Sequence, residues 1–284
     1  MDTNRKSLFQ LTASMFIFGT IGVFRRFIPM SSGVIAAARG LAGAAILLLV
    51  LTVVQKKKPD RAAIRGNLAL LLISGAVMGV NWIVLFEAYN FTSVAVATLC
   101  YYMAPVFVIL LSAPLLGEKL TARKGLCVAA ALMGMVLVSG VLDGYGGGSA
   151  AGVLLGLLAA ALYAAVILMN KKMKPMPGLD RAIIQLAAAG VVLLPYALVT
   201  GSGEATPMAL GLLAVVCVVH TGLAYALYFG SMEGLPAHTI ALLSYIDPVV
   251  AVLLSAVALR EPISIRTLLG AVLILGAAAV GETE

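Results

Sequence analysis

Charged residues are scarce in this 284-residue chain: 11% are Asp, Glu, Lys or Arg, whereas an average soluble domain has about 25%. Hydrophobic residues make up 62% of the chain, and the mean hydropathy is +1.09. A soluble fold of this size could not hide so much apolar surface from water. The composition therefore excludes a soluble globular protein and predicts an integral membrane protein, with membrane lipid covering most of its surface.

Cysteine and catalytic motifs are also nearly missing. The three cysteines, Cys100, Cys127 and Cys217, lie inside apolar runs without CxxC spacing, so we expect packing roles and neither a disulfide nor a thiol-bound metal. The chain has no Walker A, HExxH or G-x-S-x-G motif and no His/Cys cluster with metal spacing. We predict a protein that is not an enzyme and has no cofactor, so that any pumping draws on an ion or substrate gradient.

Long apolar runs are what the chain does have. A membrane-spanning helix needs about 20 mainly apolar residues, because the hydrocarbon core is about 30 Å thick. Ten such runs fit, with short separators rich in Gly, Pro, Ser and charge. They lie near 8–26, 33–55, 67–89, 93–116, 122–142, 151–171, 180–200, 207–230, 237–259 and 263–281. The fold class predicted is an all-α membrane protein of ten transmembrane helices.

One apolar run occurs twice. Leu99 to Glu118 and Leu242 to Glu261 align without a gap at an offset of 143, and ten of the twenty positions are identical. A Gly-rich break separates the two copies, which predicts a first five-helix repeat at 1–142, a linker at 143–150 and a second repeat at 151–284. Two units with an odd number of spans, joined in series, must have opposite orientations in the membrane. The sequence thus predicts inverted repeats, a common design of secondary transporters.

Lysine and arginine set the orientation. If the N-terminus is cytoplasmic, the cytoplasmic segments hold fourteen of these residues and the outer segments hold four. The positive-inside rule then places both termini in the cytoplasm. The basic run at 56–61 fits this role better than that of a nucleic-acid patch, and we expect no nucleic-acid partner.

A proline interrupts each copy of the repeated run. Pro105 and Pro248 each remove one backbone N–H and disturb the carbonyl four residues earlier, at Tyr101 and Ser244. In lipid such a carbonyl must face protein or a wet cavity. Two of them at matching depths indicate a central cavity, although kinks that serve only helix packing are the alternative.

Ionisable residues within spans are the next candidates. A charge at mid-bilayer costs about 2.5–3.5 kcal/mol on insertion scales, so such residues normally mark a pathway. Asp247 directly precedes Pro248 and has Ala104 as its counterpart; it is the best candidate for ion coupling, or else a partner of Arg39 or His220. Glu87 is a second coupling candidate, or a mouth residue paired with Arg25 or Arg26. Arg39 is expected to be a gate or anchor that could extend outward, and a substrate contact is the alternative. His220 could be an interior hydrogen bonder or a site residue, and His238 is expected at the interface.

Aromatic and polar residues near mid-depth complete the candidate site. Trp82, the only tryptophan, follows Asn81 in the third span, where it could stack on a flat or cationic substrate or serve packing alone. Tyrosines add aromatic surface with a polar tip; they are Tyr101, Tyr102, Tyr163, Tyr225, Tyr228 and Tyr245. Glu118 and Glu261 end the repeated runs, and we expect each to pair with the basic residue that follows, Arg123 or Arg266.

These residues resemble the EamA repeat of the drug/metabolite transporter superfamily. The similarity lies in Ala88 to Ser93, Ala104-Pro105-Val106 and Leu115 to Thr121, in the second copy at Asp247 to Ala251 and Leu259 to Ser264, and in Arg39. It implies a ten-helix bundle with a central cavity that works by alternating access. It also implies a metabolite substrate, often moved outward, without specifying which.

Together these observations predict a secondary active transporter that exports a small organic metabolite, amino-acid-like or an amine, across the cytoplasmic membrane. The alternatives are a multidrug or quaternary-cation proton antiporter and, less favoured, a non-transporting membrane scaffold. We expect a monomer or homodimer. The predicted substrate-binding residues are Asn81, Trp82, Tyr101, Tyr102, His220, Tyr245 and Asp247, and the ion-coupling candidates are Asp247 and Glu87.

Overall fold

The computed structural model describes residues 3–117, 121–138, 149–232, 235 and 237–281, and nearly all of them are helical. The helices of the first half are α1 (Thr3–Arg26), α2 (Ser32–Leu49), η1 (Val50–Val54), α3 (Arg61–Phe91), α4 (Val94–Tyr101), α5 (Ala104–Leu116) and α6 (Ala122–Val138). Those of the second half are α7 (Ala150–Lys171), α8 (Gly178–Thr200), α9 (Pro207–Val215), η3 (Val216–Leu223), α10 (Ala224–Met232), α11 (Ala237–Ser244), α12 (Ile246–Ala258) and α13 (Ile265–Gly281).

These elements form the ten predicted spans. Four spans are composite: α2 continues into the π-helical turn η1, α4 is followed by α5, α9 continues through η3 into α10, and α11 is followed by α12. In the described part of the chain, seven segments are long and apolar enough to cross a membrane by length and composition. The other three spans are α6, α11–α12 and α13. The protein is thus a multi-pass membrane protein.

Polar residues in the separators begin the helices. Asp60 Oδ1 accepts hydrogen bonds from the backbone N–H groups of Ala62 and Ala63 at the start of α3. Ser93 Oγ accepts one from Val96 at the start of α4, and Ser149 does the same for α7. A side-chain oxygen there satisfies N–H groups that have no partner within the helix. The short polar separators therefore fix where each span starts.

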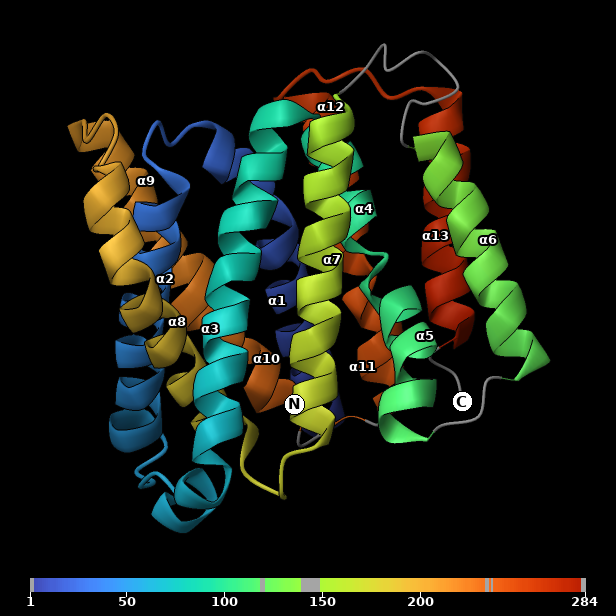
Figure 1. Cartoon of the computed structure of the whole chain (residues 1–284). Helices are drawn as coiled ribbons and strands as arrows, with labels where there is room; N and C mark the ends of the chain where they lie inside the picture. The colour runs from blue at the N-terminus through green and yellow to red at the C-terminus, as the bar shows by residue number, and fades with distance from the viewer. Residues whose placement is uncertain (1–2, 118–120, 139–148, 233–234, 236, 282–284) are drawn as a thin grey trace.

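The two halves run in opposite directions. In Figure 1, α1 begins and α13 ends at the lower end of the bundle, which we call the terminal end. The chain then alternates, so that α1 rises from the terminal end whereas α7 descends toward it. The predicted pair of inverted five-helix repeats is confirmed. The predicted linker at 143–150 lies almost entirely outside the described residues, so the proposed domain boundary stays a prediction.

Contacts between the halves follow an approximate two-fold symmetry. α2 packs on α8 and α6 packs on α13, which pairs equivalent helices. α1 packs on α12 and α10, while α7 packs on α4, α5 and α3 in the equivalent arrangement. Glycine allows the crossings: a Cβ at Gly156 would lie 2.7 Å from Cys100 Cβ, and one at Gly19 would lie 2.7 Å from Val250 Cβ. Each broken helix is therefore held by the first helix of the other repeat.

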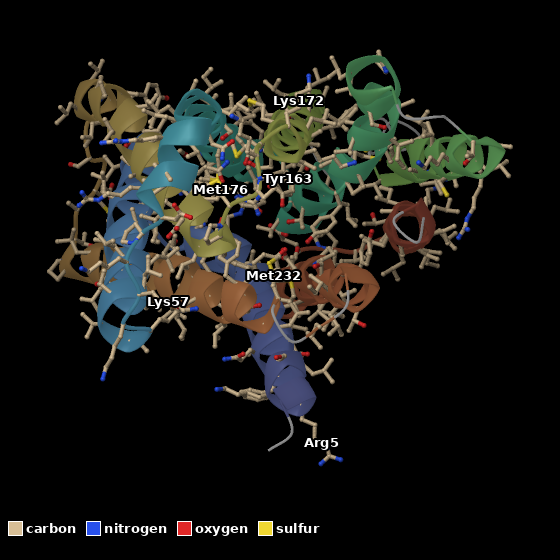
Figure 2. All side chains as sticks on the ribbon, turned by 90° about the horizontal axis from the view of Figure 1, so that it is seen from below. Arg5, Lys57, Tyr163, Lys172, Met176 and Met232 are labelled. Atoms are coloured by element: carbon tan, nitrogen blue, oxygen red, sulfur yellow. The ribbon has the colours of Figure 1, made fainter. Side chains whose placement is uncertain are left out.

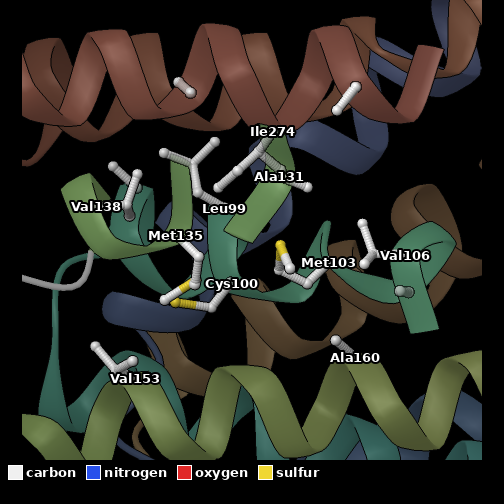
Figure 3. Close-up of a cluster of buried hydrophobic side chains, with 14 of the residues drawn as sticks. Leu99, Cys100, Met103, Val106, Ala131, Met135, Val138, Val153, Ala160 and Ile274 are labelled. Carbon is white, nitrogen blue, oxygen red and sulfur yellow. The ribbon is translucent and has the colours of Figure 1, made fainter. Parts of the chain in front are cut away.

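The largest apolar cluster lies beside the first broken helix. Leu99 and Met103 there meet Ala131 and Met135 of α6 and Ile274 of α13 (Figure 3). Cys100 and Cys127 belong to this cluster, and Cys217 is buried elsewhere. All three cysteines are free and buried, which confirms the expected packing role. The cluster braces α4 against α6 and α13 and reaches the wall of the cavity described next at Ala104.

Candidate functional site: a central cavity between two broken helices

A cavity of about 520 Å³ lies at the centre of the bundle. Residues from both halves line it. They are Phe18, Gly19, Ile21, Gly22, Arg39, Met78, Asn81, Trp82, Leu85, Phe86, Tyr89, Thr98, Tyr101, Tyr102, Ala104, Pro105, Tyr163, Ile167, Tyr225, Tyr228, Met232, Ile240, Ser244, Tyr245, Asp247 and Ala251. The volume is within the range of small-molecule sites, about 300–1,000 Å³. The cavity is therefore large enough for a metabolite.

The breaks in the two repeated spans face this cavity. The helix stops after Tyr101 and resumes at Ala104, and in the second copy it stops after Ser244 and resumes at Ile246. Each break lies just before the proline that removes a backbone donor. Pro105, Tyr101 and Ser244 all line the cavity. The cavity is thus built where the sequence predicted it, beside both interrupted helices.

Asp247 brings a carboxylate to this cavity at the start of α12. Its Oδ2 accepts a hydrogen bond of 2.9 Å from the hydroxyl of Tyr102, which lies at the break of the other copy. Among the described residues it has no ion pair with Arg39 or His220, the alternative partners considered from the sequence. The carboxylate is therefore held by a neutral group and faces the cavity.

Arg39 brings a cation to the same cavity. Its guanidinium carbon lies 4.2 Å from the centre of the Trp82 ring and 5.4 Å from that of Phe86. Its Nε donates a hydrogen bond of 3.1 Å to Thr221 Oγ1. The side chain is only 4% exposed, so it does not extend outward as the sequence alone had allowed. Trp82 is therefore the platform for this cation.

The π-helical segment η3 positions Thr221. Thr221 Oγ1 donates to the carbonyl of Val216, five residues earlier, and accepts from Arg39. π-helical turns are rare and often mark functional sites. Nothing in the local sequence indicated this turn, and Thr221 was missed.

His220 lies in the same segment but not among the residues lining the cavity. It is 1% exposed, its Nε2 lies 2.7 Å from Thr20 Oγ1, and its ring packs edge-on against Phe24. This placement fits the interior hydrogen-bonding role rather than a substrate contact. For His238 the side chain lies outside the described residues.

Asn81 joins α3 to α7 and also lines the cavity. Its Nδ2 donates a hydrogen bond of 2.6 Å to the carbonyl of Ala159. Its Oδ1 is buried and has no hydrogen-bond partner among the described residues. A buried acceptor without a partner is costly, so this amide oxygen is an unsatisfied polar group beside the cavity.

The predicted tyrosines gather around the cavity. Tyr101 stacks on Tyr163 with ring centres 5.3 Å apart, and Tyr102 contacts both Tyr101 and Tyr245. Tyr225 and Tyr228 also line the cavity and pack against Phe18. The sequence missed Tyr89, whose hydroxyl lies 3.4 Å from Thr98 Oγ1 in the cavity wall.

Glu87 does not line the cavity. It lies near the outer end of α3, opposite the terminal end, and accepts a hydrogen bond from Asn90 Nδ2. No ion pair joins it to Arg25 or Arg26 among the described residues. Arg25 instead donates to the carbonyl of Ile28 and to Ser32 Oγ.

A polar cluster ties the helices together at the end opposite the termini. Glu261 forms an ion pair of 3.0 Å with Arg26 and accepts hydrogen bonds from the Val94 N–H and from Ser255 Oγ. Arg26 also donates to the carbonyl of Thr92. The expected pairing of Glu261 with Arg266 is therefore wrong, because the chain brings Arg26 of α1 to Glu261 instead. Glu118 lies outside the described residues.

The cavity extends toward the terminal end. Met232, the last residue of α10, and Ile240 of α11 both line it. Seen from the terminal end, Met232 and Tyr163 lie near the middle of the bundle, with Lys57, Lys172 and Arg5 around them (Figure 2). The lining of the cavity thus includes residues near the terminal end, while the Glu261 cluster joins α1, α4 and α12 at the other end.

The sequence profile of the EamA-like transporter family matches this chain twice, over residues 5–140 and 150–280. The chain belongs to the EamA-like transporter family. The two matches correspond to the two inverted halves of the bundle.

Individual relatives agree with this assignment. The uncharacterized transporter YxxF of Bacillus subtilis is 26% identical over 88% of this chain and 81% of its own length. The PecM protein of Dickeya dadantii is 27% identical over 91% of this chain and 86% of its own length. The RarD protein of Streptomyces exfoliatus is 27% identical over 82% and 74%. One solved crystal structure matches 97% of this chain and 96% of its own with a TM-score of 0.67 at 21% identity, which shows the shared fold.

Proposed function

We propose that this EamA-family protein is a secondary active transporter that exports a small organic metabolite, amino-acid-like or an amine, across the cytoplasmic membrane. The observation that supports this most is the cavity between two inverted halves, with one carboxylate, Asp247, on its wall. Inverted repeats with broken helices at mid-membrane are a common architecture for alternating access. The family match supports transport and leaves the substrate and direction as proposals.

The positive-inside rule supports the orientation that we propose. Lys56, Lys57 and Lys58 follow the span formed by α2 and η1 and lie at the terminal end with both chain termini. Basic residues concentrate on the cytoplasmic side of a membrane protein. We therefore place both termini in the cytoplasm, so that the cavity faces the cytoplasm, from which an exporter takes its substrate.

Asp247 is the ion-coupling group in this proposal. A carboxylate in the membrane interior is costly when charged, so binding a cation or proton there is favourable. Its contact with Tyr102 links α12 to the break between α4 and α5. A change in its charge would thus affect both broken helices, and rocking of one five-helix unit against the other would carry substrate and coupling ion across.

Proteoliposomes test the proposed function. Purified protein is reconstituted and challenged with labelled amino acids and amines under an imposed pH or sodium gradient. We expect gradient-driven flux of at least one compound in the wild type and none in Asp247→Asn. If no compound responds to any gradient, the transport proposal fails; if Asp247→Asn behaves as wild type, the coupling role fails.

A second candidate is a quaternary-cation proton antiporter. The aromatic lining and the Asp247 carboxylate favour it, because cations bind well to aromatic faces and carboxylates. Resistance assays with lipophilic cations distinguish the two, since only the antiporter should protect cells.

A further inference from the structure

Arg39 is a buried cation that has no counter-ion among the described residues. In that part of the chain no carboxylate lies within 4.0 Å of it. Asp247, the carboxylate among the described residues that line the cavity, is bonded to Tyr102 instead. Buried charges in proteins are normally paired or bound to a ligand, because an isolated charge is costly in an apolar environment. Arg39 therefore lacks the partner that such a residue ordinarily has.

The contacts of Arg39 leave the two terminal nitrogens of its guanidinium without a hydrogen-bond partner among the described residues. Trp82 and Phe86 lie against the guanidinium, and Nε is used by Thr221. No described residue accepts a hydrogen bond from Nη1 or Nη2, although the side chain lines the cavity. A guanidinium held in this way presents its terminal nitrogens in the geometry that suits a carboxylate.

The two opposite charges share one cavity without pairing. Arg39, Asp247 and the tyrosines Tyr89 and Tyr101 all line this cavity. The remaining wall is mostly apolar, with Met78, Leu85 and others. The ligand that neutralises both charges at once carries an anion at one end and a cation at the other, on an apolar body.

We propose that Arg39 binds the carboxylate of the substrate, while Asp247 faces its amine, so that the substrate is a small zwitterionic amino carboxylate with an apolar side chain. This rests on the proposed transport function and narrows it: simple amines and quaternary cations lack the group that Arg39 needs. Arg39 is then a specificity-determining residue, and the platform of Trp82 and Phe86 positions it.

Binding to purified protein in lipid nanodiscs tests this. The probes are L-leucine and L-phenylalanine, their amides, and the corresponding amines 3-methylbutylamine and 2-phenylethylamine. At least one amino acid should bind about tenfold or more tighter than its amide or amine, since a charge-assisted pair contributes about that much. Arg39→Gln should remove this preference, so that an amino acid binds no tighter than its amide or amine.

Two further variants control for folding and for charge alone. Arg39→Lys keeps the positive charge but loses the planar guanidinium that can donate two parallel hydrogen bonds to a carboxylate. Its preference for amino acids over amides and amines should therefore be intermediate. Arg65→Gln removes an exposed arginine at the start of α3 and should bind as wild type. Thermal unfolding checks that each variant is folded. If Arg39→Gln does not fold, the proposal is tested by the ratios of the affinities for amino acid, amide and amine in the wild type and in Arg39→Lys.

The proposal is overturned if amines or amides bind as tightly as the amino acids, if Arg39→Gln keeps the wild-type ratio, or if none of the six probes binds the wild type. Gradient-driven flux of an amine would refute this inference and leave the transport function standing. Carboxylate-selective binding without any gradient-driven flux would refute the transport function and leave the role of Arg39 standing.

Discussion

The two broken helices share a sequence and a place in the fold, yet only one carries a charge. α4–α5 and α11–α12 each break just before a proline, line the same cavity, and are crossed by the first helix of the other repeat. The second copy has Asp247 where the first has Ala104. The duplicated scaffold therefore builds the cavity, and a departure from the repeat adds the carboxylate.

Arg39 is the charge that the other half contributes. α2 and α8 cross where Gly40 faces Gly190, and a Cβ at Gly40 would lie 2.5 Å from the Gly190 nitrogen. Beside this crossing, Arg39 of α2 lines the cavity. The first half thus brings a cation to the cavity and the second half brings the Asp247 carboxylate, and these two residues set the polarity of the site.

The largest expected effect on transport comes from removing the Asp247 charge, which makes both helix breaks uncharged. Asp247→Asn should abolish gradient-driven uptake in proteoliposomes but leave part of the substrate exchange across the membrane, because the coupling charge is lost while the Asn oxygen can still accept a hydrogen bond from the substrate's amine. Ala104→Ser, a small polar change at the equivalent position of the first copy, should keep both activities. Loss of exchange together with gradient-driven uptake in Asp247→Asn would show that the residue holds the structure rather than the coupling ion.

The contact between the breaks is the next most sensitive feature. Tyr102→Phe removes the hydrogen bond to Asp247, and a bond to a charged group contributes about 1.5–3 kcal/mol. Transport efficiency should fall about tenfold or more, because about 1.4 kcal/mol of lost stabilisation is a factor of ten in rate. Tyr196→Phe removes an exposed hydroxyl outside the cavity lining and should stay close to wild type. Equal losses in the two variants would mean that the Tyr102 contact has no special role.

The glycine crossings test whether the two halves are equally well braced. Gly156→Ala and Gly19→Ala each place a Cβ within 2.7 Å of a side chain on a broken helix, and overpacking costs about 1–3 kcal/mol. Both should lower the thermal unfolding temperature. Gly211→Ala, where nothing lies within 4 Å of the added carbon, should not lower it. If only one of the two crossing variants is destabilised, the halves are braced unequally.

The smallest effect is expected at the Glu261 cluster. Glu261→Gln loses the ion pair with Arg26 but keeps an oxygen for the Val94 N–H, and a partly exposed pair contributes about 0.2–1 kcal/mol. The fraction of molecules in which the cavity is open at the end opposite the chain termini should rise a few-fold. Labelling of a cysteine at Ile21, in a background without the native cysteines, measures this with a membrane-impermeant reagent. Glu204→Gln, at the same end, is the control; an equal rise there would remove Glu261 from this role.

Much of the fold could be predicted because its signals are local. Apolar length fixes the spans, and the repeated run with Pro105 and Pro248 reveals the duplication and the breaks. The site residues on that run, Tyr102, Tyr245 and Asp247, follow from the same pattern.

Other contacts could not be predicted, since they join residues far apart in the chain. The inward turn of Arg39 depends on Trp82 and Thr221, and Thr221 depends on a π-helical segment without a sequence signature. Glu261 forms its ion pair with Arg26, which is 235 residues away in the sequence, and not with its near neighbour Arg266. For the same reason, helical position alone did not show that Glu87 and His220 lie away from the cavity.

The most direct test is the accessibility of Ala104 from the two sides of the membrane. A cysteine at Ala104, in a background without Cys100, Cys127 and Cys217, should react with a polar thiol reagent applied on either side in turn, and substrate should slow the reaction. That result is expected if the two inverted halves alternately expose a central cavity. A cysteine that reacts with no polar reagent, or from one side only under all gradients and substrates, would contradict the account.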